Sequence, residues 1–157
     1  MEQIKTFNKG YKSLRKGRRS LANYFYLITS QTHKRAPVFV TNEAAQIIMQ
    51  SLQWFGSRDL ISLDTVVVMP DHVHLLGQLR EISLEKIMQQ FKSFTAKAIN
   101  RHLNLSGSIW QAGFHDHAVR KDEDLNQIRL YCLNNPVRAG LVDDFHAYPY
   151  WYCRWKV

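Results

Sequence analysis

Two histidines, His72 and His74, are the residues whose types and spacing point most directly to chemistry. They open a predicted strand that follows a Pro70-Asp71 turn. Successive side chains of a strand point to opposite faces, so both imidazoles should lie on one face of the sheet. Two neutral imidazoles on one face can share a divalent metal ion. Two polar surface histidines would give the same pattern, so the motif alone leaves both interpretations open.

Tyr131 and Asn135 form a second candidate pair, four residues apart in the sequence. If the helix predicted here continues that far, the phenol and the amide lie close together on one helix face. Asn135 precedes Pro136, and a residue before proline is biased away from helical angles. A packing role for Tyr131 therefore stays open, and Asn134 or Gln127 could present the amide instead.

A third cluster, His115-Asp116-His117, lies on a strand predicted over 114–120. Its two histidines share one face by the same alternation and could bind a metal ion. We favour phosphate contact, or hydrogen bonding that fixes a wall of the active site, over direct ligation.

The elements that must position these residues follow from hydrophobic periodicity. Aromatic and β-branched runs predict strands, and apolar residues at helical spacing after good N-cap residues predict helices. The order is βαββαβ followed by a helix, which is a ferredoxin-like α+β plan: an antiparallel sheet with two helices on one face and the other face free for function. The predicted strands are 24–29, 60–69, 72–79 and 114–120, and the predicted helices begin at the caps Asn42, Ser83 and Asp122.

The composition indicates one basic domain of 157 residues. Lys and Arg number 21 against 13 Asp and Glu, a formal net charge of +8. Such a surplus favours nucleic acid or another polyanion as a partner. Basic residues crowd positions 1–20, which reads as a DNA-binding segment or a solvated tail, and residues 143–157 form an aromatic C-terminal tail.

Other function classes find no support in the sequence. Its two cysteines, Cys132 and Cys153, form neither a metal-binding pair nor a secreted disulfide framework. The N-terminus lacks the apolar core of a signal peptide, and no apolar run approaches a membrane span. We therefore expect a cytoplasmic, nucleoid-associated protein with no membrane partner.

Five strings in the right order carry a family resemblance over nearly the whole chain. The chain resembles the REP-associated tyrosine transposases, the single-tyrosine branch of the HUH endonucleases. The matching strings are Tyr11-x-x-Leu14-Arg15-x-Gly17-Arg18-x-Ser20, Met69-Pro70-Asp71-His72-Val73-His74-Leu75-Leu76, Trp110-Gln111-x-Gly113-Phe114-His115-Asp116-His117, Tyr131-x-x-x-Asn135-Pro136-Val137-Arg138-Ala139-Gly140-Leu141 and Tyr148-Pro149-Tyr150-Trp151.

The resemblance implies a metal-dependent transesterase that acts on single-stranded DNA folded into REP-type palindromic hairpins. It assigns Tyr131 as the nucleophile that forms a 5′-phosphotyrosine, and His72, His74 and Asn135 as ligands of Mg²⁺ or Mn²⁺. A replication-initiator or relaxase nickase shares the His-x-His strand, but the string after Tyr131 argues against it. A domesticated binding domain that no longer cuts is the alternative from another class. Oligomeric state, monomer or homodimer, stays open.

DNA contacts are expected from basic and aromatic side chains. The resemblance places the N-terminal segment near a short tetranucleotide at the foot of the hairpin, where arginines could read guanine edges or hold phosphates. Trp110, Tyr150 and Trp151 could stack on unpaired bases, although core packing is the role we favour. The basic candidates are Arg15, Lys16, Arg18 and Arg19 in the N-terminal segment, with Lys92, Lys97, Arg101, Arg120 and Arg138 along a phosphate track.

Overall fold

The structure is a computed structural model that describes residues 20–157. A five-stranded sheet forms its centre, with the order β4-β1-β3-β2-β5 and every neighbouring pair antiparallel. This is the expected ferredoxin-like α+β plan with one short strand added at the edge. The strands are β1 (Phe25–Gln31), β2 (Ile61–Met69), β3 (His72–Leu79), β4 (His115–Ala118) and β5 (Trp151–Cys153).

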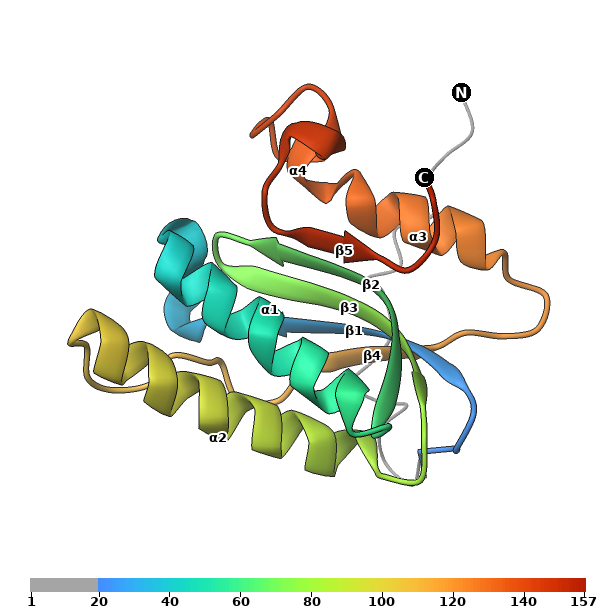
Figure 1. Cartoon of the computed structure of the whole chain (residues 1–157), viewed down its shortest axis with the longest axis horizontal. Helices are drawn as coiled ribbons and strands as arrows, with labels where there is room; N and C mark the ends of the chain where they lie inside the picture. The colour runs from blue at the N-terminus through green and yellow to red at the C-terminus, as the bar shows by residue number, and fades with distance from the viewer. Residues whose placement is uncertain (1–19) are drawn as a thin grey trace.

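Helices cover both faces of the sheet (Figure 1). On one face lie α1 (Asn42–Ser57) and α2 (Leu84–Leu103), and on the other lie α3 (Leu125–Leu133) and α4 (Asn135–Arg138). Short 3-10 turns occupy His33–Arg35, Val38–Val40 and Phe145–Ala147. Within residues 20–157, no helix is long and apolar enough to cross a membrane.

Alternation along the strands builds two hydrophobic cores. Ile28, Val66 and Leu75 face α1 and α2, and Leu27 and Leu76 face α3. Burying one such side chain stabilises the fold by about 1.5–3 kcal/mol. The face predicted to be free is therefore partly covered, because α3 and the C-terminal segment pack on it.

Two of the three predicted helix caps are displaced by one or two residues. Ser83 does cap α2, where its side chain accepts a hydrogen bond from the Lys86 amide. The cap of α1 is Thr41 rather than Asn42, because the Thr41 hydroxyl accepts from the Ala44 amide. For α3 the cap is Asp124 rather than Asp122. In each case an oxygen-bearing side chain that can cap a helix stands close to the one expected.

Trp110 belongs to the core, as favoured from the sequence. Its ring lies 5.5 Å from that of Phe91 and 5.2 Å from that of Phe39, and its indole nitrogen donates to the Thr95 hydroxyl at 3.0 Å. The loop between α2 and β4 is thus fixed to α2. Tyr150 and Trp151 are half-buried and pack against the hydrophobic cores.

Candidate active site

The two histidines of β3 lie side by side on the face that α3 partly covers. Their ring centroids are 4.8 Å apart, and β3 is held between β1 and β2 in the middle of the sheet. His72 Nδ1 lies 2.7 Å from Asp71 Oδ1, and His74 Nδ1 lies 2.9 Å from the Thr29 hydroxyl. A partner on Nδ1 fixes the ring orientation and leaves Nε2 as the atom that can reach a metal ion.

Burial keeps both imidazoles in the neutral form that binds metals. Burial, followed by electrostatic interaction with His72, Arg138 and Arg35, lowers the pKa of His74 to about 3. Burial also lowers the pKa of His72, although the neighbouring Asp71 carboxylate opposes this shift. For Asp71 itself, burial is outweighed by His72 and Arg35, which lower the pKa of the carboxyl.

Tyr131 reaches the histidine pair from α3. Its ring centroid lies 6.4 Å from that of His74, and the side chain is half-buried. The guanidinium carbon of Arg138 lies 4.1 Å from the centroid of the Tyr131 ring, and Arg138 Nη2 donates to the Tyr131 carbonyl oxygen at 2.7 Å. A cation over an aromatic face is attracted by the ring quadrupole. Arg138 therefore contacts both the ring and the backbone of Tyr131.

Asn135 follows Tyr131 across a break in the helix. The sequence predicts that this helix ends at about Asn134, and α3 does end at Leu133, but a further short helix, α4, begins at Asn135. The break agrees with the pre-proline position of Asn135. The Asn135 side-chain nitrogen is buried without a hydrogen-bond partner. The nitrogen and oxygen of an amide side chain have nearly the same shape, so a flip of the Asn135 amide would put its oxygen in this position. A buried polar atom without a protein partner fits an amide oxygen that faces a cation.

A metal site here needs that amide. Within residues 20–157, no group of three or more His, Cys, Asp and Glu side chains is arranged to hold a metal ion. His72 and His74 supply two nitrogen ligands, and Asn135 is the predicted third ligand. Two imidazoles and one amide leave coordination positions open for phosphate oxygens, which suits Mg²⁺ or Mn²⁺.

The third histidine cluster divides between the two faces of the sheet. His115 pairs with Thr29 and His117 with Leu27, which places both histidines on the side of His74. His117 Nε2 lies 2.8 and 2.9 Å from the two Glu123 carboxylate oxygens, so it ties β4 to the loop before α3. His115 is exposed, two strands from His74 and thus about 10 Å away.

Asp116 has a different position from its neighbours. It pairs with Ile28, whose side chain packs in the core on the α1 and α2 side of the sheet. The structure therefore places Asp116 on the opposite face from the histidine pair.

The basic candidates within residues 20–157 are dispersed over the molecule, and Arg138 contacts Tyr131. The Lys92 amine donates to the Gln111 and Gly113 carbonyl oxygens and so fixes the loop after α2. Lys97 and Arg101 are exposed on α2, and Arg120 is exposed near the start of α3. Arg15, Lys16, Arg18 and Arg19 lie outside the described residues.

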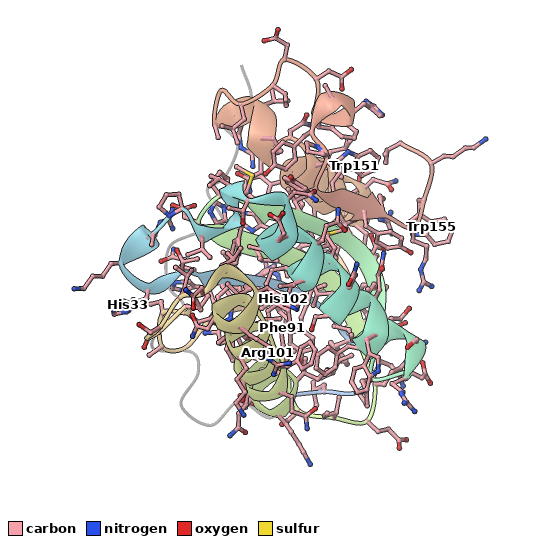
Figure 2. The ribbon with its side chains drawn as sticks, turned by 60° about the vertical axis from the view of Figure 1, so that its left-hand side comes forward. His33, Phe91, Arg101, His102, Trp151 and Trp155 are labelled. Atoms are coloured by element: carbon pink, nitrogen blue, oxygen red, sulfur yellow. The ribbon has the colours of Figure 1, made fainter. Side chains whose placement is uncertain are left out.

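Sequence reasoning missed the ion pair that holds α3 in place. Arg129 Nε and Nη2 lie 2.6 and 2.7 Å from the two Asp64 carboxylate oxygens, beside a β-bulge between Leu63 and Thr65. Trp155 donates to the same carboxylate at 3.3 Å and belongs to the C-terminal segment, as does Trp151 (Figure 2). An aspartate inside the apolar run of β2 was the available signal, because a buried carboxylate requires a partner.

The comparisons with known proteins agree with this fold. A family model described as IS200-like transposase matches residues 20–135. The chain therefore belongs to this family of transposases, which are enzymes. Its place in the REP-associated tyrosine branch follows from a Haemophilus influenzae protein described as a REP-associated tyrosine transposase. The two are 33% identical over 141 residues, covering 81% of this chain and 77% of the relative.

Solved structures support the fold. A REP-associated tyrosine transposase bound to a REP hairpin superposes with a TM-score of 0.70 and 21% identity, covering 85% of this chain and 79% of the other. A Deinococcus radiodurans protein described as a transposase gives a TM-score of 0.53 and 22% identity, covering 75% and 95%.

Proposed function

We propose that this chain cleaves and rejoins single-stranded DNA at REP-like palindromic hairpins, with Tyr131 as the nucleophile. The observation that carries the proposal is that the Tyr131 ring lies 6.4 Å from the His74 ring and 4.1 Å from the guanidinium carbon of Arg138. A hydroxyl nucleophile beside two metal-binding imidazoles and a cation is the arrangement that phosphoryl transfer needs. The solved relative bound to a REP hairpin supports this class of substrate.

The covalent step is a transesterification. The Tyr131 phenolic oxygen loses its proton and attacks the scissile phosphorus, and the bond from phosphorus to the 3′ oxygen breaks. The products are a 5′-phosphotyrosine and a strand that ends in a 3′-hydroxyl. One phosphodiester replaces another, so a second 3′-hydroxyl can reverse the reaction and join strands.

A divalent cation, Mg²⁺ or Mn²⁺, would be held by His72, His74 and Asn135, and it would supply charge neutralisation at the phosphate and the 3′ oxygen. Asp71 and Thr29 orient the two imidazoles through their Nδ1 atoms. Ligand partners of this kind commonly change metal affinity or activity by about 10–100-fold when they are removed.

Arg138 and the N-terminal cations would hold the DNA. Arg138 is exposed and lies against the nucleophile, so its guanidinium can take a phosphate oxygen without leaving the site. Arg15, Lys16, Arg18 and Arg19 would contact the strand at the hairpin foot, as the family resemblance implies.

A denaturing gel with an end-labelled REP hairpin tests the proposal. Wild-type protein with Mg²⁺ or Mn²⁺ should give a denaturant-resistant protein–DNA adduct, and both Tyr131→Phe and His74→Ala should abolish it. Tyr24→Phe is the matched control, since Tyr24 is an exposed tyrosine outside the site. Cleavage that persists in Tyr131→Phe would show that Tyr131 is not the nucleophile. Hairpin binding by wild type without any adduct would favour a binding domain that does not cut DNA.

A further inference from the structure

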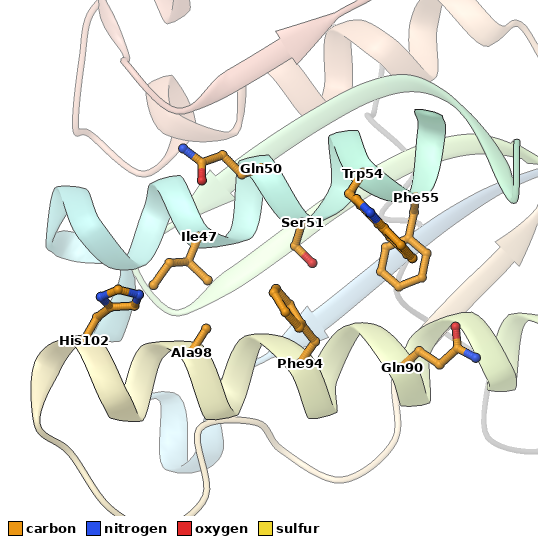
Figure 3. Close-up of a pocket in the computed structure, with 9 residues that line it drawn as sticks. All are labelled: Ile47, Gln50, Ser51, Trp54, Phe55, Gln90, Phe94, Ala98 and His102. Carbon is orange, nitrogen blue, oxygen red and sulfur yellow. The ribbon is translucent and has the colours of Figure 1, made fainter. Parts of the chain in front are cut away.

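A groove with a volume of about 610 Å³ lies between α1 and α2, on the side of the sheet away from Tyr131. Ile47 and Trp54 line it from α1, and Phe94 and Ala98 line it from α2 (Figure 3). Pockets of this size commonly hold a ligand of several rings. The proposed chemistry uses none of these residues.

The groove displays two aromatic rings that the fold leaves largely exposed. Trp54 is 51% exposed and Phe94 is 60% exposed, whereas Phe55 and Phe91 on the same helices are 3% and 1% exposed. Figure 3 shows Trp54 and Phe94 pointing into the space between the two helices. Neighbouring exposed apolar rings of this kind mark a contact surface more often than an isolated one does.

The surroundings of the groove are basic and rich in amides. The Arg58 guanidinium lies 5.3 Å from the Trp54 ring centroid, and exposed Lys97 and Arg101 follow Phe94 along α2 at spacings of three and seven residues. Among residues 20–157, no carboxylate lines the groove. The amides of Gln50 and Gln90 line its walls and can both donate and accept hydrogen bonds.

These charges select among the possible occupants. A second copy of this chain would bring an identical basic rim, and a net charge of +8, against the first. The acidic residue Glu43 lies one turn before Ile47, at the far end of α1 from Arg58. Basic side chains around exposed aromatic rings are instead the pattern that binds unpaired nucleotides, because every base can stack and every phosphate is negative.

We propose that this groove is an accessory site for single-stranded DNA that flanks the hairpin. Unpaired bases stack on Trp54 and Phe94, and Arg58, Lys97 and Arg101 contact the phosphates. That this strand flanks a hairpin rests on the proposed function, but binding of the strand in the groove needs no cleavage. Since the sheet separates this groove from Tyr131, the site should engage only substrates with a tail long enough to pass the sheet edge.

Fluorescence anisotropy with two labelled hairpins tests the proposal, one with a 20-nucleotide oligo-dT tail and one without. Trp54→Ala and Phe94→Ala should each weaken binding of the tailed hairpin about tenfold and leave the tail-less hairpin unchanged. Tyr24→Ala, at another exposed aromatic residue, should change neither. Equal affinity of wild type and both groove variants for the tailed hairpin would overturn the proposal.

A charge variant gives an independent readout. Lys97→Gln with Arg101→Gln should make the affinity for the tailed hairpin less dependent on salt, by a slope of about 0.7 for each contact removed. Lys97 and Arg101 are exposed on α2, so these substitutions should leave the core intact. An unchanged salt slope would contradict the phosphate contacts.

Two further measurements separate this site from its alternatives. Sedimentation of wild type and Trp54→Ala shows whether the groove joins two copies, and a wild-type dimer that dissociates in the variant, with unchanged DNA affinity, would overturn the proposal. Tyr131→Phe should bind the tailed hairpin like wild type. If wild type forms no adduct but the groove variants still lose tailed binding, the proposed reaction fails and the groove site stands.

Discussion

At the scale of single residues, the site depends on side chains that hold the reacting groups rather than react. Asp71 holds the His72 ring and is itself held by Arg35, whose Nε lies 2.9 Å from the second carboxylate oxygen. Thr29 holds the His74 ring, and Arg138 holds Tyr131. The sequence predicted the candidate reacting residues by type, but most of these partners come from other elements.

Asp71→Asn should weaken metal binding by about 10–100-fold, because the amide no longer offers a full negative charge to the His72 ring. Titration of Mn²⁺ followed by electron paramagnetic resonance measures this affinity without any turnover. Asp59→Asn is the control, since Asp59 forms a comparable surface pair with Arg80 at 3.2 Å. Equal Mn²⁺ affinity in Asp71→Asn and wild type would show that this contact does not tune the site.

Arg138→Ala should slow adduct formation about 100-fold while hairpin affinity falls much less, because the guanidinium acts on the nucleophile and its phosphate together. Single-turnover rates and anisotropy separate the two effects. Arg138→Lys should recover only part of the rate, since an ammonium cannot stack on the Tyr131 ring as a guanidinium does. Arg80→Ala, at an arginine that forms a surface pair with Asp59, is the control. A parallel loss of rate and affinity would reduce Arg138 to a phosphate contact.

At the scale of elements, one ion pair fixes α3, the helix that carries Tyr131. Asp64 is 3% exposed, and Arg129 lies two residues before Tyr131 on α3. Strand β3 was predicted with the bounds that the structure has, because alternation is a local property of the sequence. The end of α3 was predicted to within one residue, because proline is also a local signal. The Asp64–Arg129 pair joins residues 65 positions apart, so local patterns could not predict it.

Arg129→Met should lower the free energy of unfolding by about 3–5 kcal/mol, because it leaves the Asp64 carboxylate buried and unpaired. The double variant Asp64→Leu with Arg129→Met should recover part of that loss. Arg80→Met, which breaks the surface pair with Asp59, should cost about 1 kcal/mol or less. Chemical denaturation measures all three, and a double variant less stable than Arg129→Met would contradict the explanation.

Cys132 reports whether α3 stays docked. Burial raises the pKa of its thiol to about 12, so at pH 8.5 it is neutral as well as inaccessible. Iodoacetamide should therefore modify half-buried Cys153 in the native protein and reach Cys132 only after unfolding. In Arg129→Met, native Cys132 should become reactive. Mass spectrometry of peptides gives both extents, and equal native labelling of the two cysteines would show that α3 opens freely.

At the scale of the whole molecule, the two faces of the sheet carry different candidate sites. Helix α3 lies on one face of the sheet, and α1 and α2 lie on the other (Figure 1). The histidine pair and Tyr131 are on the α3 side, whereas the aromatic groove lies between α1 and α2. The sequence predicted the ferredoxin-like order and the family, because both rest on motifs and periodicity. It did not predict the groove, since exposure of Trp54 and Phe94 is decided by how two helices pack.

The surplus of positive charge should make hairpin binding strongly dependent on salt, since each neutralised phosphate releases condensed counterions. If Arg15, Lys16, Arg18 and Arg19 each neutralise one phosphate of the hairpin, affinity should fall about 100-fold between 50 and 200 mM salt. Replacing these four residues with glutamine should then flatten the plot of log affinity against log salt. The same number of substitutions at the glutamines Gln46, Gln50, Gln53 and Gln89, each changed to alanine, is the uncharged control for the tail-less hairpin. A slope that stays unchanged in the N-terminal variant would show that other residues make the phosphate contacts. Arg138 and Arg120 would then be the first residues to replace.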